Sequence, residues 1–165
     1  MINKWIVMGC LSLIATSALS STFTTSFNVT ATVSAACSVT ASTLAFGTYN
    51  PTLASTLNAS TTLNVTCTNG SAYNVGLDPG AGIGATVANR LMTRTSGGSD
   101  TIAYGLYSNS GLTTVWGNTI SSNTVTGTGN GSSQPITIYG SIFASNATSI
   151  PPAGYSDSVN VTVTY

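Results

Sequence analysis

The sequence predicts an all-β fold, a Greek-key sandwich of the immunoglobulin-like type. Short segments alternate apolar and polar residues with a period of two, which is typical of half-buried strands. Turn signals made of Gly, Pro, Asn and Ser separate these segments about every 8–12 residues, the spacing expected of a sandwich. No segment keeps the periodicity of an amphipathic helix, and no internal repeat is evident.

The expected elements follow one another along the chain. Each predicted strand carries apolar residues on one face and ends at a turn signal; in chain order these are residues 38–48, 61–68, 73–78, 90–95, 101–108, 134–145 and 156–165. The segments between them are rich in Gly, Pro, Asn, Ser and Thr and predict turns and loops at residues 49–60, 79–89, 96–100, 109–111, 118–133 and 146–154.

The composition fits a single domain with very little charge. At 165 residues the chain is long enough for one stable core. Its three basic and three acidic residues give zero net charge, and His and Glu are absent; the charged residues are Lys4, Asp78, Arg90, Arg94, Asp100 and Asp157. This argues against nucleic-acid binding, which needs clustered Lys and Arg, and against disorder, which goes with high net charge. It suits a packed extracellular assembly.

The first twenty residues predict a secretory signal peptide. Lys4 and the amino terminus form a positive region, and residues 5–15 form an apolar run that is too short to span a bilayer. Residues 18–20 place small side chains where a signal peptidase cuts, so that the mature chain is expected to begin at Ser21.

Export would place the cysteines of the mature chain in an oxidising compartment. Removal of the leader leaves Cys37 and Cys67, an even pair in an oxidising compartment, and a disulfide is expected. Its loop of about 30 residues would stabilise the fold by roughly 3–4 kcal/mol. Metal ligation is the alternative, but His, a further Cys and nearby acidic residues are missing. Lipidation at Cys10 is another alternative, although cleavage there would leave almost no apolar region.

The mature chain has an alternating segment at each end. Near the start, one face holds the polar Thr25 together with Phe23, Phe27, Val29, Ala31 and Val33. At the end, one face holds Val159, Val161, Val163 and Tyr165. Such end strands can close a sheet on the chain itself or lend a strand to a neighbour.

Catalytic and cofactor motifs are missing. General acid–base chemistry usually needs His or paired carboxylates, and the three Asp residues lie in separate segments. No G-x-S-x-G surrounds a serine. The glycines of residues 80–84 suggest a phosphate loop only superficially, because no Lys follows and no helix pattern opens after them. The sequence therefore predicts neither an enzyme nor a bound cofactor or metal.

Several motifs stand in the order typical of a known family. They are R-L-M (90–92), I-A-Y-G-L-Y-S (102–108), V-W-G (115–117), I-Y-G-S-I-F-A (138–144) and P-P-A-G-Y-S-D-S-V-N-V-T-V-T-Y (151–165). The cysteine pair and the F-G at residues 46–47 fit the same pattern. In these residues the chain resembles the spore coat protein U domain family, the pilin subunits of archaic, Csu-type chaperone–usher pili.

The resemblance implies an incomplete immunoglobulin-like sandwich, which donor-strand complementation completes. After the signal peptide at residues 1–20, it implies a donor strand at residues 21–35 and a pilin domain at residues 36–165. A periplasmic chaperone would pair with the terminal strand carrying Val159, Val161, Val163 and Tyr165. At the outer-membrane usher, the donor strand of another copy or a related pilin would replace it, inserting Phe23, Phe27, Val29, Ala31 and Val33.

The function implied by the resemblance is that of a structural subunit exported to the cell surface. It would polymerise into a fibre used in adhesion and biofilm formation. Two alternatives remain, a spore or cell-surface coat protein and a minor adhesin that binds surface glycans. A tip adhesin would carry a binding domain before its pilin domain, and the loop at residues 118–133 lacks aromatic residues. The structural subunit is therefore favoured.

Overall fold

The computed structural model describes residues 19–53, 55–144 and 149–165. The chain divides into two units, residues 1–32 and residues 33–165. The described residues up to Ala36 form neither helix nor strand, and the side chains of Phe23, Phe27 and Val29 are 82–95% exposed. The predicted signal peptide lies outside the described residues except for Leu19 and Ser20.

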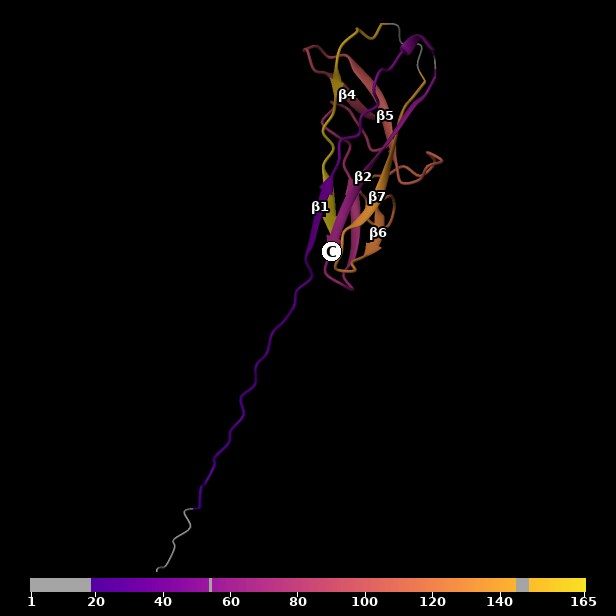
Figure 1. Ribbon diagram of the computed structural model, residues 1–165. Helices are drawn as coiled ribbons and strands as arrows, with labels where there is room; N and C mark the ends of the chain where they lie inside the picture. The colour runs from indigo at the N-terminus through magenta and orange to yellow at the C-terminus, as the bar shows by residue number, and fades with distance from the viewer. Residues whose placement is uncertain (1–18, 54, 145–148) are drawn as a thin grey trace, which may run out of the picture. The chain divides into compact units, whose positions relative to one another are not determined.

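The regular secondary structure of the second unit is almost all β-strand (Figure 1). Its described residues contain one short 3-10 helix, η1 (Pro51–Leu53), and the strands β1 (Cys37–Ala41), β2 (Leu57–Cys67), β3 (Ala72–Leu77), β4 (Arg90–Arg94), β5 (Thr101–Tyr107), β6 (Val125–Thr128), β7 (Gln134–Ile142), β8 (Tyr155–Ser156) and β9 (Val161–Thr164). They form a six-stranded sheet, in the order β1-β2-β7-β5-β4-β8, and a three-stranded sheet, β6-β3-β9. Every pairing is antiparallel, and the predicted all-β fold is confirmed.

The core lies between the two sheets. Alternate residues of the strands point inward, as the period of two predicts. Leu63 and Val65 of β2 and Val75 of β3 are fully buried. Trp116, between β5 and β6, is also fully buried, and its indole N–H donates a 2.8 Å hydrogen bond to the carbonyl of Val75. The tryptophan thus joins the connecting segment to the smaller sheet.

Two predicted loops were partly wrong. β2 begins at Leu57, inside the loop predicted for residues 49–60, because its first residues pair with the end of β7, beginning with Leu57 opposite Ile142. β6 forms inside the loop predicted for residues 118–133, because Val125–Thr128 pairs with β3. In both places pairing with a distant strand outweighs a loop-like local composition.

The terminal strand predicted for residues 156–165 is two strands in different sheets. β8 pairs with β4 in the larger sheet, and β9 pairs with β3 in the smaller one. Residues 157–160 connect them and form no strand, so Val159 lies outside β9. Side-chain carboxylates hold this connection in place of a strand ladder. Asp78 accepts hydrogen bonds from the backbone and side-chain amides of Asn160, and Asp157 accepts one from the backbone N–H of Ala81.

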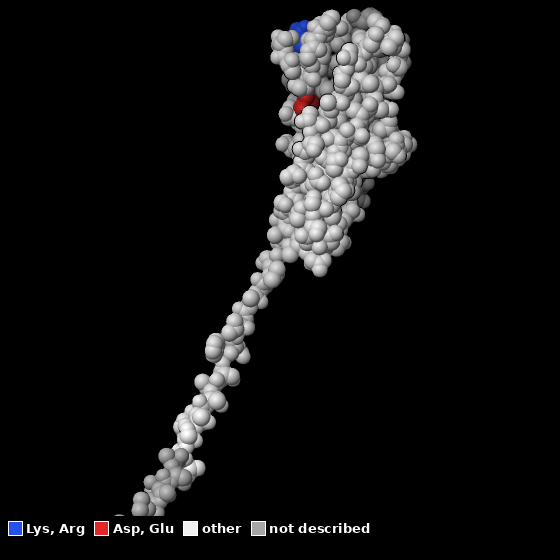
Figure 2. All heavy atoms as spheres, in the orientation of Figure 1, with Lys and Arg blue, Asp and Glu red and all other residues white. Residues whose placement is uncertain are grey.

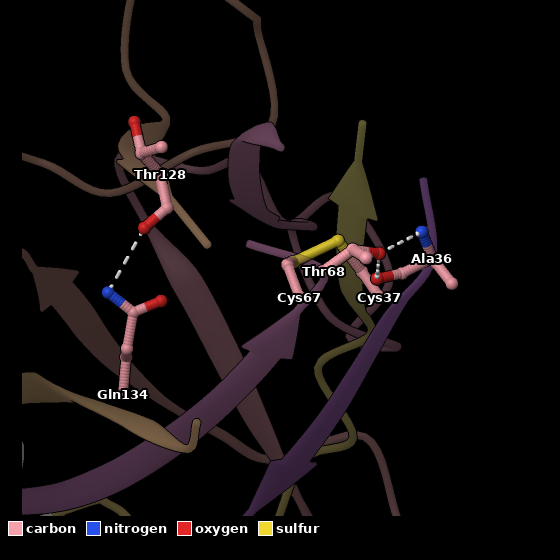
Figure 3. Close-up of a disulfide and its surroundings, with 6 residues drawn as sticks. All are labelled: Ala36, Cys37, Cys67, Thr68, Thr128 and Gln134. Carbon is pink, nitrogen blue, oxygen red and sulfur yellow. Dashed lines mark hydrogen bonds between the residues drawn. A yellow bond between two sulfur atoms is a disulfide. The ribbon is translucent and has the colours of Figure 1, made fainter. Parts of the chain in front are cut away.

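The predicted disulfide is confirmed. Cys37 and Cys67 lie directly opposite each other in the register of β1 and β2, and their sulfur atoms are bonded (Figure 3). Beside it, the hydroxyl of Thr68 accepts a 2.7 Å hydrogen bond from the N–H of Ala36 and lies 3.0 Å from the carbonyl of the same residue. These contacts fix the first residues of β1 to the end of β2.

Candidate functional site

An apolar groove opens into the side of the sandwich. It consists of two adjoining cavities of about 410 Å³ and 870 Å³, which share Leu44, Phe46, Met92 and Tyr155 in their linings. One wall is the segment that follows β1, and the other is the segment around β8 that leads to β9. The groove reaches the core of the sandwich, because core side chains form its floor: Leu77, Ile102, Tyr104, Leu106, Ile138 and Ile142.

The first wall offers unpaired backbone. β1 stops at Ala41, and the last backbone hydrogen bond of this stretch runs from the N–H of Ser42 to the carbonyl of Thr62. No backbone–backbone hydrogen bond joins residues 43–49 to another described residue. Unpaired N–H and C=O groups beside an apolar surface are a template for pairing with an added strand.

The second wall also ends at an open strand edge. β9 pairs only with β3 among the described strands, so it is the edge of its sheet, and β1 is the edge of the larger sheet. The two edges lie beside each other without pairing (Figure 1). The groove therefore opens along the seam where the larger and smaller sheets meet without a closing strand.

One polar pair stands in the groove. The phenol of Tyr104 donates a 2.7 Å hydrogen bond to Oδ2 of Asp157, and both residues line the smaller cavity. The ring of Tyr104 also makes an edge contact with Phe46, with ring centres 6.1 Å apart. Desolvation and the hydrogen bond to Asp157 raise the pKa of Tyr104, so it stays a neutral hydrogen-bond donor.

Beside the groove, a fully buried arginine ties several segments together. The guanidinium of Arg90 donates hydrogen bonds of 2.8–3.0 Å to four backbone carbonyls, those of Leu77, Asp78, Val87 and Trp116. Burial lowers the pKa of Arg90, and the nearby Tyr104, Asp78 and Asp157 oppose that change. The arginine fixes the turn after β3, to which the groove wall at residues 157–160 is hydrogen-bonded.

The predicted terminal-strand residues fall in different places. Val159 and Val161 line the groove, and Val163 packs against the core. Tyr165 follows β9 and is 59% exposed, so it does not share the half-buried face of the valines. The predicted donor residues lie in the segment without secondary structure, and their assignment to a partner's groove stays a prediction.

Sequence reasoning missed Arg90 and Asp157 as parts of the site. Both were assigned no role beyond a strand or turn position. The partners of Arg90 are carbonyl groups, which every residue carries, so no residue pattern could reveal them. Asp157 interrupts an otherwise apolar and hydroxyl-rich segment between residues 150 and 165, and that single acidic residue was the available signal.

The described residues show neither a metal centre nor a membrane helix. No group of three or more His, Cys, Asp or Glu side chains lies close enough to hold a metal ion. No described helix has the length and apolar character needed to cross a bilayer. Almost the whole of the face seen in Figure 2 is uncharged.

The comparisons with known proteins agree with this architecture. A family model, the Spore Coat Protein U domain, matches residues 23–162. The chain belongs to this family. No curated protein matches the sequence.

One similar solved structure is the CsuC–CsuE chaperone–tip adhesion subunit pre-assembly complex from archaic chaperone–usher Csu pili of Acinetobacter baumannii. The match has a TM-score of 0.61 and 20% identity, and it covers 81% of this chain. It spans 41% of the solved chain. At this identity the similarity shows a shared fold.

Proposed function

We propose that this chain is a structural pilin subunit of a chaperone–usher surface fibre. The groove carries this proposal, because it exposes core side chains along a wall whose backbone is unpaired at residues 43–49. A sandwich with such an opening is completed by an added strand, whose main chain pairs with the walls and whose alternate side chains fill the groove.

The proposed occupant is the segment of residues 21–35 from a second copy or a related subunit. It has the required alternation, and its apolar side chains are solvent-exposed; they are Phe23, Phe27, Val29 and Val33. Each such side chain contributes roughly 1.5–3 kcal/mol when buried, so several in a row would hold subunits together firmly. Chain after chain, the same exchange builds a fibre.

Assembly at the cell surface needs a route that protects the open groove. An exposed apolar edge invites aggregation. A periplasmic chaperone that pairs with the groove before assembly, and an outer-membrane usher where the exchange takes place, complete the proposal. The family membership and the shared fold support both partners. Export directed by residues 1–20 belongs to the same proposal.

A structural role is favoured over glycan binding. Carbohydrate sites usually stack sugars on exposed aromatic side chains. Among the described residues of the second unit, the exposed large hydrophobic residues are Val33, Leu53, Ile83, Ile120 and Tyr165. Tyr165, after β9, is the one aromatic among them, so no described loop between strands presents an aromatic of this kind. Adhesion and biofilm formation would then be properties of the fibre as a whole.

Deletion of residues 21–33 tests the proposal. The shortened subunit should still bind its chaperone and accept a donor strand, but it should terminate fibres because it cannot donate one. Electron microscopy and the ladder of fibre lengths on a gel measure this outcome. If the deleted chain still forms full-length fibres, the segment closes its own domain and the proposal fails.

A matched pair of substitutions sharpens the test. Phe27→Asp places a charge on the apolar face of the donor segment, and Asn28→Asp places the same charge on the opposite face. Only Phe27→Asp should prevent fibre formation, because only that side chain would enter a groove. Equal effects of the two substitutions would contradict donation by this face.

A further inference from the structure

The apolar groove contains one carboxylate with spare hydrogen-bonding capacity. Oδ1 of Asp157 accepts hydrogen bonds from the N–H groups of Ala81 and Ser158, at 2.7 and 2.8 Å. Oδ2 accepts one from the phenol of Tyr104. A carboxylate has about four acceptor positions, so one position on Oδ2 has no partner among the described residues.

A strand that covers the groove removes water from this carboxylate. Around Asp157 the groove is lined by apolar side chains that include Phe46, Met92 and Val159. An acceptor that loses water without gaining a donor is destabilising, and a charged acceptor more so. A hydrogen-bond donor on the covering strand would therefore stabilise the complex at this point.

The apolar run of the proposed donor segment, residues 23–33, has one suitable side chain. In this run Thr25 carries the single hydroxyl on the face otherwise formed by Phe23, Phe27, Val29, Ala31 and Val33, and Ser21 precedes the run on the same face. We infer that Thr25 of one copy donates its hydroxyl hydrogen to Oδ2 of Asp157 in the copy that receives the strand. This inference rests on the proposed function and adds to it the register of the donor strand.

The pairing fixes register because of the strand period. A slip by one residue would turn the apolar face of the donor out of the groove. A slip by two residues would keep that face inward but place Phe23 or Phe27 against the carboxylate. Apolar contacts alone would make registers that differ by two residues nearly equivalent. The hydrogen bond between Thr25 and Asp157 selects one of them.

Three substitutions in the donor segment test this, with fibre dissociation in urea as the measurement. Thr25→Val keeps the shape of the side chain and removes the hydroxyl, and fibres should dissociate about tenfold faster or more, as expected for loss of a hydrogen bond to a charged group. Thr25→Ser keeps the hydroxyl and should stay within about threefold of the parent rate. Thr24→Val, on the opposite face, should leave the rate unchanged.

The direction of the Thr25→Val effect distinguishes a hydrogen bond to Asp157 from apolar contacts alone. If Thr25 contacts only apolar side chains, valine would slow dissociation or leave it unchanged, and either outcome overturns the inference. In fibres carrying Asp157→Asn the effect of Thr25→Val should fall to about threefold or less, because the two residues would interact. An undiminished effect there also overturns it. If Asp157→Asn subunits do not assemble, the three donor-segment variants decide.

These outcomes differ from failure of the proposed function. Donation by this segment fails if chains lacking residues 21–33 still form full-length fibres. If that deletion stops fibre growth while Thr25→Val fibres dissociate at the parent rate, strand donation stands and only the register is wrong.

Discussion

Nη2 of Arg90 donates a 2.8 Å hydrogen bond to the carbonyl oxygen of Trp116, and both side chains are completely buried. The same nitrogen donates to the carbonyl of Leu77, and the indole of Trp116 donates to Val75. The first residue of β4, the end of β3 and the segment after β5 are thereby joined at one point. Backbone carbonyls accept the hydrogen bonds of the charged guanidinium, and no carboxylate of the described residues forms an ion pair with it.

Removal of this guanidinium should be strongly destabilising. Arg90→Met leaves four carbonyl groups without their donor, and we expect the free energy of unfolding to fall by about 3 kcal/mol or more. The free energy of unfolding of Arg90→Lys should lie between those of the parent and Arg90→Met, because an ammonium group keeps the charge but not the several N–H donors of the guanidinium. Denaturation of the mature protein in urea measures both.

Arg94 provides the matched control. It lies four residues along the same strand and forms an ion pair with Asp100, 3.1 Å between Nη1 and Oδ2, near the surface. Arg94→Met should cost no more than about 1 kcal/mol, as for other exposed ion pairs. Equal losses at the two arginines would contradict the role assigned to Arg90.

The disulfide should be complete in the secreted protein and important for its stability. Thiol labelling of the denatured, unreduced chain should find no free thiol at Cys37 or Cys67. Replacement of both cysteines by serine should lower the free energy of unfolding by roughly 3–4 kcal/mol, because the closed loop restricts the unfolded chain. Two labelled thiols per chain, or unchanged stability of the double variant, would count against this.

The alternation of apolar residues predicted the strands that line the core. Leu63, Val65, Val75 and Ile138 repeat with the period of two and are buried as expected. The switch of sheets after β8 could not be predicted in this way, because the valines at 159, 161 and 163 keep one period through it. Next to the switch, Asp78 is hydrogen-bonded to Asn160, 82 residues away, and local sequence carries no trace of that pairing.

The groove was predicted only through the resemblance to a family. The period of two predicted a strand at each end of the mature chain. It did not decide whether these strands close the chain's own sheet or pair with a neighbouring subunit. The absence of a closing strand is a property of the whole sandwich, visible only when β1 and β9 are both edges. The polar pair of Tyr104 and Asp157 was missed for the same reason, since the two residues come from different strands and segments.

The connection between β8 and β9 should weaken in acid. Desolvation raises the pKa of Asp78, but the hydrogen bonds from Asn160 and Gly80 and the charge of Arg90 together lower it below the ordinary 3.8. A carboxyl with a lowered pKa in the folded state stabilises the fold above its unfolded pKa, and the stabilisation is lost as the pH falls through the folded pKa.

The expected pH dependence follows from that sign. The melting temperature of the mature protein should decrease when the pH is lowered below about 4. Part of this decrease should be missing in Asp78→Asn. At neutral pH the same variant should melt lower than the parent, because the charged acceptor of Asn160 and Gly80 is gone. Parallel melting curves of parent and variant across this range would contradict the assignment.

The final prediction concerns the groove wall at β9. Val161 lines the groove and packs against the core, whereas its neighbour Thr162 is exposed on the opposite face. Val161→Asp should abolish recovery of a chaperone complex from the periplasm, because it would bury an unpaired charge where the proposed chaperone strand lies. Thr162→Asp adds the same charge outside the groove and should leave the yield of complex unchanged. Co-purification with the chaperone measures both variants; a normal yield with Val161→Asp would remove β9 from the chaperone-binding edge.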